Sequence, residues 1–345
     1  MRIWSLMIIF SALLSSFSPA RAGERPVRVL TTLSVLQELV EEIGGERVKA
    51  THLASPFQDP HYIQPKPTLM QMARKADMFI EVGLQLELWA EKVVVGAGNP
   101  KIQSGQPGRV IASSGVRTLE MPTVLSREWG DIHPYGNPHI WLDPINLKQM
   151  ARNILEGLRS VDPDGAEGYE KREVSFENRI DLALFGADLV AAVGGGKLTR
   201  LSLEGTLIGY LQHHELLDRL GGWLQRSRPL WGKDIVTYHK TWIYFTSRFG
   251  LKIRDEIEEF PGIAPGARHR DRLVEMIRRE NIQALMVSNF YRMQPVEYIS
   301  EKTGARILSV PIDVGGSPET ADYFLLIGHI LDQLLGVYGN PDSGV

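Results

Sequence analysis

The chain has 345 residues, of which 43% are hydrophobic and 23% charged, and its formal net charge is -3. This length and composition exclude a disordered or fibrous protein and predict a sizeable core in two domains. The small net charge, without any basic tract, excludes a nucleic-acid-binding surface. The chain has no cysteine, which excludes disulfides and thiolate metal sites and predicts no lipid-anchored cysteine, so any bound metal must be held by His, Asp or Glu.

The first 22 residues have the pattern of a secretory signal peptide. Arg2 precedes an apolar run that ends at Leu14, and residues 20–22, Ala-Arg-Ala, form a small-x-small cleavage signal. The run is too short to cross a membrane, and the small residues after it disfavour the alternative of an N-terminal helix of the mature fold. We therefore expect a signal peptide at 1–22 and a soluble, monomeric protein exported to the periplasm without a lipid anchor.

Runs of β-branched residues then alternate with helical patterns. Strands are predicted at 27–33, 48–55, 77–83 and 109–114, and helices at 34–44, 69–76 and 86–94. A β-α series with short connections predicts a mostly parallel sheet that is covered by helices. We expect this N-terminal α/β lobe to occupy residues 23–160.

A long helical region follows the first lobe. Asp162 and Pro163 form a favourable cap and first-turn pair for a helix. One face of that helix carries four apolar residues, Tyr169, Phe176, Ile180 and Leu184. Such a helix can pack against two lobes and join them rigidly. From Ala183 to Pro229 the pattern indicates an inserted segment of short helices punctuated by glycines, and we expect connector and insertion together to fill 161–228.

A second β-α series closes the chain. Strands are predicted at 234–239, 251–258, 283–289 and 306–313, and helices at 242–250, 272–281 and 295–304. The pattern predicts a C-terminal α/β lobe over residues 229–345. The expected fold class is therefore α/β, with two lobes, each with a mostly parallel sheet covered by helices, and a long rigid connector helix between them.

Common catalytic signatures are missing from the sequence. The run GGGKL at 194–198 is not a phosphate loop, because Leu198 stands where a hydroxyl must bind magnesium. The chain contains no HExxH, no GxSxG and no GxGxxG motif. An enzyme of a familiar motif class is therefore not predicted.

Four potential metal ligands occupy matching positions in the two lobes. His61 follows a predicted strand, His239 and Asp313 end predicted strands, and His139 enters from a Gly- and Pro-rich loop before a helix. Open α/β sheets place ligands at the carboxyl ends of their strands, and a preceding proline stiffens the loops of His61 and His139. Three imidazoles and one carboxylate suit zinc, whereas manganese prefers more oxygen ligands. A metal site with two ligands from each lobe follows from this pattern.

The remaining histidines and the nearby aromatic residues have simpler interpretations. His133 is interpreted as a solvated loop residue, with an accessory metal contact as the alternative. His213 and His214 are adjacent on a helix, so they face different directions and do not readily share one ion. The residues interpreted as structural, or as core, are His52, His269, His329, Trp141, Trp242 and Tyr244.

Four segments carry a resemblance to a known family: QDPHYIQPKP, NPHIWLDP, VTYHKTWIYFTSRFGL and VPIDVGG. They resemble the metal-binding proteins of zinc and manganese ABC transporters, over most of the chain from Val27 onward. The resemblance implies two α/β lobes bridged by a long helix, with the ion in the cleft. Its ligand positions map onto His61, His139, His239 and Asp313, and a histidine at 239, where manganese-preferring members commonly have glutamate, favours zinc.

Some residues depart from the family pattern. Phe57 replaces a usual glycine before the first ligand segment, which we expect to change the shape of that loop. Thr241 and Trp242 replace small residues after the third ligand, which we expect to narrow the cleft.

The predicted function is that of a periplasmic solute-binding protein, not an enzyme, that captures zinc and delivers it to an ABC permease in the inner membrane. One alternative is the same fold carrying manganese or iron. Another is a secreted zinc-dependent hydrolase with a general base among Asp143, Glu256 and Glu258.

Overall fold

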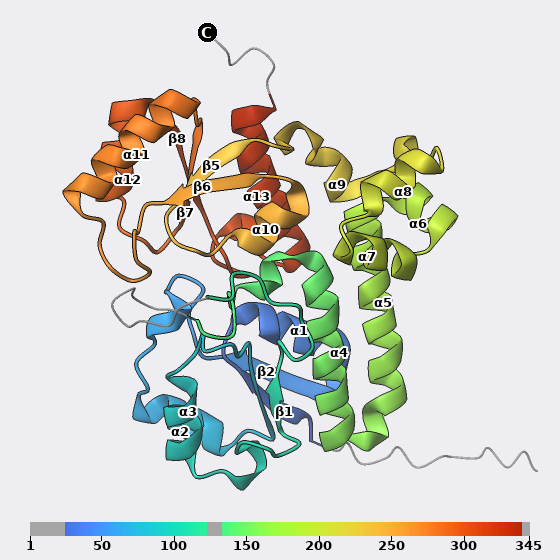
Figure 1. The fold of residues 1–345 in the computed structure, drawn as a ribbon. Helices are drawn as coiled ribbons and strands as arrows, with labels where there is room; N and C mark the ends of the chain where they lie inside the picture. Colours follow the sequence, from blue (N-terminus) through green and yellow to red (C-terminus); the bar gives the residue numbers. More distant parts are fainter. Residues whose placement is uncertain (1–24, 123–132, 340–345) are drawn as a thin grey trace, which may run out of the picture.

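The computed structural model describes residues 25–122 and 133–339 (Figure 1). The predicted signal peptide lies outside the described residues. Two parallel four-stranded sheets, each flanked by helices, form two lobes that lie one above the other in Figure 1. The predicted fold class is therefore confirmed, whereas the predicted division at residues 160 and 228 stays a prediction.

The first lobe contains a sheet with the strand order β2-β1-β3-β4. Its strands are β1 (Val27–Thr31), β2 (Val48–His52), β3 (Met78–Glu81) and β4 (Arg109–Ile111), and its helices are α1 (Ser34–Gly44), α2 (Pro67–Arg74) and α3 (Ala90–Ala97). The last of these helices begins four residues later than predicted, because Gly83, Leu84 and Gln85 have positive φ and form a turn in place of a helical start.

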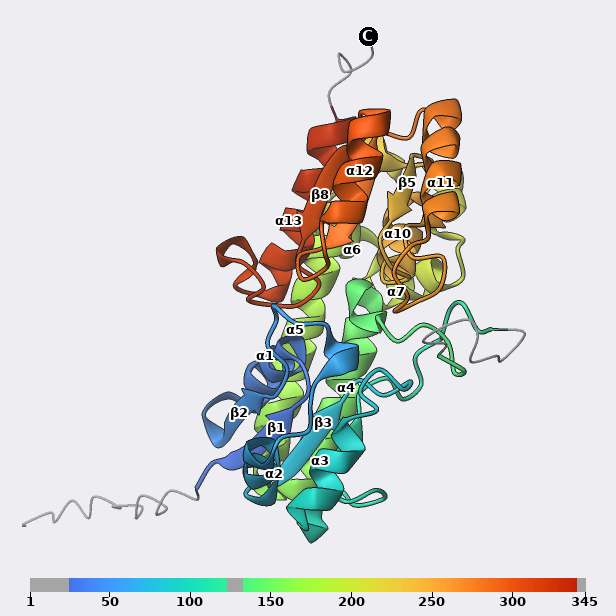
Figure 2. The ribbon, with the colours of Figure 1, turned by 90° about the vertical axis from the view of Figure 1, so that its left-hand side faces the viewer.

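Two long antiparallel helices, α4 (Pro144–Val161) and α5 (Ala166–Phe185), run along the side of the molecule (Figure 2). All four apolar residues predicted for the connector are buried on α5. The predicted cap at Asp162 is wrong, because its carboxylate makes no capping bond and instead pairs with Arg47, with Nε–Oδ2 at 2.7 Å. A short turn at Pro163–Gly165 therefore separates the two helices.

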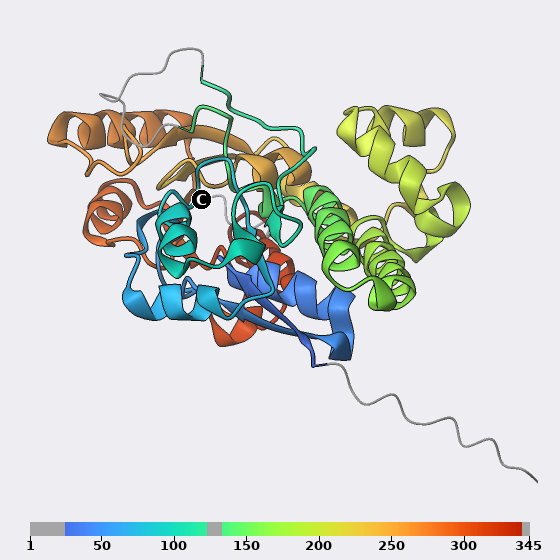
Figure 3. The same ribbon diagram turned by 90° about the horizontal axis from the view of Figure 1, so that it is seen from below.

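The inserted segment consists of short helices, as predicted. They are α6 (Ala187–Val193), α7 (Gly195–Leu203), α8 (Leu207–His213) and α9 (Gly222–Arg226). Gly186 and Gly194 interrupt them with φ of 84° and 88°, which other residues rarely adopt. The first three helices lie on the outer side of α5, away from both sheets (Figure 3).

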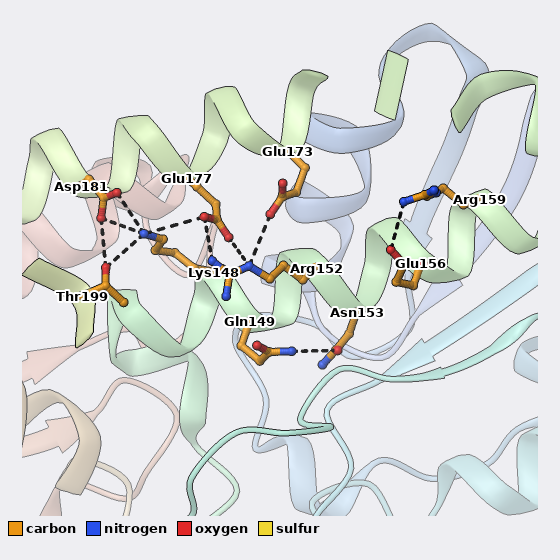
Figure 4. Close-up of polar contacts among 10 residues, drawn as sticks. All are labelled: Lys148, Gln149, Arg152, Asn153, Glu156, Arg159, Glu173, Glu177, Asp181 and Thr199. Atoms are coloured by element: carbon orange, nitrogen blue, oxygen red, sulfur yellow. Dashed lines mark hydrogen bonds and ion pairs between the residues drawn. The ribbon is translucent and has the colours of Figure 1, made fainter. Parts of the chain in front are cut away.

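A buried ion pair fastens the inserted segment to the two long helices (Figure 4). The ammonium of Lys148 on α4 donates to both carboxylate oxygens of Asp181 on α5, at 2.8 and 3.0 Å, and to the hydroxyl of Thr199 on α7, at 3.1 Å. About two turns earlier on α5, burial and the neighbouring carboxyl of Glu177 raise the pKa of Glu173 to about 7. Three helices therefore meet at one cation.

The second lobe contains a sheet with the strand order β6-β5-β7-β8. Its strands are β5 (Asp234–Thr237), β6 (Lys252–Glu256), β7 (Ala284–Ser288) and β8 (Arg306–Val310), and its helices are α10 (Ile243–Phe249), α11 (Ala267–Glu280), α12 (Gln294–Thr303) and α13 (Tyr323–Tyr338). Strand β8 ends three residues before Asp313, because Pro311 has no amide hydrogen to continue the ladder.

The main apolar core is continuous between the lobes. It joins Val29 of the first sheet to Ile235 of the second, and Trp141, which follows the second predicted ligand, is fully buried within it. A smaller cluster that includes Val236 and Leu285 packs on the second sheet. Within 25–122 and 133–339, no helix combines the length and apolar character that a bilayer span requires.

Candidate metal centre

Three histidines from separate loops converge between the lobes. His61 lies in a short turn after β2, and His139 immediately precedes a turn that leads into α4. His239 lies two residues beyond β5 of the second lobe. One ring nitrogen of each lies within 4.8 Å of the others, and no other group of three or more potential ligands occurs among the described residues. The structure therefore brings together three of the four residues that the sequence predicts as ligands, and their role as ligands stays a prediction.

The Nδ1 atom of each imidazole has its own oxygen partner. His61 Nδ1 lies 2.6 Å from Asp59 Oδ1, His139 Nδ1 lies 3.0 Å from the Asn137 side-chain oxygen, and His239 Nδ1 lies 2.9 Å from Glu258 Oε2. Because ionised carboxylates and amide oxygens only accept, each neutral ring carries its hydrogen on Nδ1. The lone pair is then on Nε2, which is the arrangement that metal-binding histidines use.

Electrostatics favour the neutral form of the central ring. Burial, together with the charges of His61, His239 and His133, holds the pKa of His139 well below its usual range. Burial opposes the ionisation of Asp59, but the hydrogen bond and charge of His61 outweigh it, so the pKa of Asp59 is lowered. A neutral ring at His139 and an anionic partner behind His61 both suit the binding of a cation.

Asp313 is not one of the three converging residues. Its carboxylate is buried and accepts hydrogen bonds from the amides of Ser34, at 3.1 Å, and Val35, at 2.9 Å, in the first turn of α1. These amides have no partner within the helix, so an anion stabilises them. Burial raises the pKa of Asp313 and these hydrogen bonds oppose the rise. The carboxylate does not belong to the three-histidine group, and its role as a ligand stays a prediction.

His133 is a half-buried loop residue. Its Nε2 lies 3.2 Å from Nε2 of His61, and the two ring centroids are 5.2 Å apart. The ring therefore lies beside the three-histidine group, where the alternative interpretation as an accessory metal contact would require it, and that interpretation stays a prediction. The only signal in the sequence was that His133 shares a loop with His139.

Aromatic side chains surround the centre. Trp141 is fully buried, as predicted, and its indole donates to the carbonyl of Ile312 at 2.6 Å. Tyr291, which sequence reasoning missed, stacks on Tyr238 with centroids 4.4 Å apart and lies 5.9 Å from the ring of His239. No motif marks Tyr291, because it reaches the centre from the loop after β7. On the side of His61, a cavity of about 460 Å³ opens to the surface.

The two residues that depart from the family pattern after His239 are buried. Thr241 is 1% exposed and Trp242 is 0% exposed, and Trp242 belongs to the main core. Phe57, by contrast, is 60% exposed. The rings of His213 and His214 make an edge-to-face contact, with centroids 4.9 Å apart and ring planes at 88°, and neither residue belongs to the three-histidine group.

Comparison with known proteins places these features in a family. The family model described as zinc-uptake complex component A, periplasmic, matches residues 29–183 and 213–336. The iron-binding protein YfeA of Yersinia pestis is 23% identical over 341 residues, which cover 96% of this chain and 92% of YfeA. The manganese ABC transporter substrate-binding lipoprotein PsaA of Streptococcus pneumoniae is 23% identical and covers 89% of this chain and 88% of its own.

Solved structures agree with the fold. A crystal structure of ZnuA matches with a TM-score of 0.68 at 21% identity, covering 91% of this chain and 99% of that chain. The family model leaves out the residues between 183 and 213, which are the α6–α8 part of the insertion. Helices α6 to α8 therefore lie almost wholly outside the residues that the family model matches, whereas α9 lies within them.

The expected localisation needs correction. PsaA is named a lipoprotein, and so are MntA of Halalkalibacterium halodurans and FimA of Streptococcus parasanguinis. Lipoproteins are anchored in a membrane by lipid. Although this chain holds no cysteine, the expectation of a soluble protein without a lipid anchor runs against these relatives and is withdrawn.

Proposed function

The chain belongs to the family of zinc-uptake complex component A, and from this premise we propose that it is the substrate-binding protein of a metal ABC transporter whose cargo is zinc. One observation carries the proposal: three imidazoles from both lobes converge, and each has Nδ1 bonded to an oxygen, which leaves the lone pair of the neutral ring on Nε2. Neutral imidazoles are preferred zinc ligands. The same protein hands the ion to a membrane permease.

Asp313 is the proposed oxygen ligand of this set. It would supply the negative charge that three neutral imidazoles lack. Its two lobe-spanning hydrogen bonds, to the amides of Ser34 and Val35, also place it at the junction between the second lobe and α1. Binding of the ion by Asp313 would therefore couple the cargo to that junction.

The choice of cargo is tested by metal content. Protein isolated from cells grown with balanced zinc, manganese and iron is expected to contain zinc in an equimolar amount, because a nitrogen-rich site disfavours manganese. Elemental analysis of the purified protein measures this directly. Manganese in place of zinc would show that the cargo is the metal named for PsaA, and iron would show that it is the metal named for YfeA.

The hydrolase alternative has less support. Glu258 is bonded to His239. Asp143 accepts from the amide of Ile145, which caps α4, and from Arg248. Burial raises the pKa of Glu256 to about 7, which suits a general base, but Glu256 is not in the three-histidine group. We therefore expect the zinc-loaded protein to turn over no ester or peptide.

Zinc affinity is expected to fall as the pH is lowered, because protons compete with the ion for imidazole nitrogens. His139 should contribute no proton, since burial already holds its pKa well below its usual range. Calorimetry at pH 6 in two buffers of different ionisation enthalpy counts the protons released. A proton released from every imidazole of the group would show that His139 is charged before the ion binds.

A further inference from the structure

Asn137 contacts the segments that carry two of the converging imidazoles, those of His139 and His239. Its side chain is 4% exposed. The amide oxygen accepts from the backbone NH of His139 and lies 3.0 Å from its ring Nδ1. The amide nitrogen donates to the carbonyl of Lys240, at 2.5 Å, and to Glu120, at 2.8 Å. Because the two ends of the amide have different partners, its orientation is determined by them.

The Lys240 carbonyl makes this contact unusual, because it belongs to the residue after His239 in the other lobe. The backbone of Asn137 is held across the lobes as well, since its carbonyl accepts from the hydroxyl of Tyr244 on α10 at 2.8 Å. That hydroxyl also accepts from the amide of Leu119, at 3.1 Å. The loop that carries His139 is therefore tied to the second lobe at two points.

The partners of the other two imidazoles act differently. The carboxylate of Asp59 accepts a hydrogen bond from the backbone amide of His61, two residues along the chain, and lies within hydrogen-bond distance of its ring Nδ1. Glu258 bonds His239 and the amide of Gly262, and all three residues belong to the second lobe. Each of these carboxylates holds its ring from within one lobe, whereas Asn137 contacts the ligand segments of both.

We propose that Asn137 is a positioning residue with two separable roles. Its oxygen orients the His139 ring, and its NH2 group fixes the distance between that ring and His239 by holding the backbone beside His239. The inference rests on the proposed function, in which both rings bind the cargo. A ligand set that is assembled from two lobes needs such a link, because small displacements of one lobe separate the nitrogens.

Asn137→Asp separates the two roles. The carboxylate still accepts from His139, so the ring keeps its tautomer, but it cannot donate to Lys240 and it repels Glu120. We expect zinc affinity to fall at least about tenfold, the lower end of the effect of losing an outer contact. The number of imidazole ligands, measured by X-ray absorption with zinc bound, should be unchanged. Amide hydrogen exchange at Thr241, which bonds the His239 carbonyl at 2.7 Å, should accelerate.

Asn153→Asp is the matched control. Asn153 also donates its amide to two backbone carbonyls, those of Ala112 and Ser114, but entirely within the first lobe. Zinc affinity should not change in this variant. If Asn137→Asp fails to fold, Tyr244→Phe removes the second tie without altering the amide, and a smaller change in the same direction is expected.

The lobe-linking role would be overturned if Asn137→Asp bound zinc with unchanged affinity while His139→Ala lost binding. Where Asn137→Asp does not fold, unchanged affinity in Tyr244→Phe has the same meaning. If His139→Ala also bound zinc normally, the proposed function itself would fail. The two failures are therefore distinguishable by the same titration.

Discussion

Replacing His139 by alanine is expected to weaken zinc binding by more than about a hundredfold, because loss of an outer-shell contact alone weakens metal binding by about 10–100-fold. His139 is 1% exposed and is one of the three converging rings, so its removal leaves two imidazoles facing a buried position. Competition against a chelator of known affinity measures the change. Retention of wild-type affinity would contradict the proposed centre.

His52→Ala provides the control for this experiment. His52 also has its Nδ1 bonded to a side-chain oxygen, that of Gln37 at 2.7 Å, but it is outside the three-histidine group. Its removal should leave zinc affinity unchanged. Thermal unfolding of both variants without metal separates loss of a ligand from loss of the fold.

Replacing Lys148 by methionine is expected to lower the free energy of unfolding by about 3–5 kcal/mol, the usual effect of removing one partner from a buried ion pair. The side chains of Lys148 and Asp181 are 3% and 5% exposed. Without the ammonium, the carboxylate of Asp181 stays buried with the Thr199 hydroxyl as its remaining side-chain partner. Urea denaturation measures the change. A loss within experimental error would show that this network is not essential to the fold.

Two controls test whether the uncompensated charge is the cause. The double variant Lys148→Met, Asp181→Leu should recover most of the stability, because apolar replacements of a buried pair are commonly neutral. Lys171→Met breaks an exposed pair with Glu167 and should have no measurable effect. Equal destabilisation by the single and double variants would point to packing rather than charge.

The convergence of three histidines was predictable from sequence because it depends on topology. Parallel strands direct their carboxyl ends to one edge, so residues just beyond β2 and β5 must approach the same cleft once the lobes face each other. His139 follows the same logic through the loop before α4. The buried face of α5 was equally predictable, because apolar residues recur along it at helical spacing.

Polar contacts between distant segments were not predictable in this way. The sequence did not indicate that the carboxylate of Asp313 is bonded to amides of α1, which lie 279 and 278 positions earlier in the chain. Asp162 was assigned as a cap and instead pairs with Arg47. Asn137 was read as part of a motif without a role. In each case the hydrogen-bond partner depends on which of several polar groups lies nearby in the folded chain. The sequence alone does not say which group that is.

The continuous apolar core has a consequence for how the protein unfolds. Because Val29, Trp141 and Ile235 belong to one cluster, neither sheet can lose its packing while the other keeps it. The two lobes should therefore denature together as a single cooperative unit, and not as two independent modules. Any ion captured by histidines from both lobes would then raise the melting temperature of the whole chain at once.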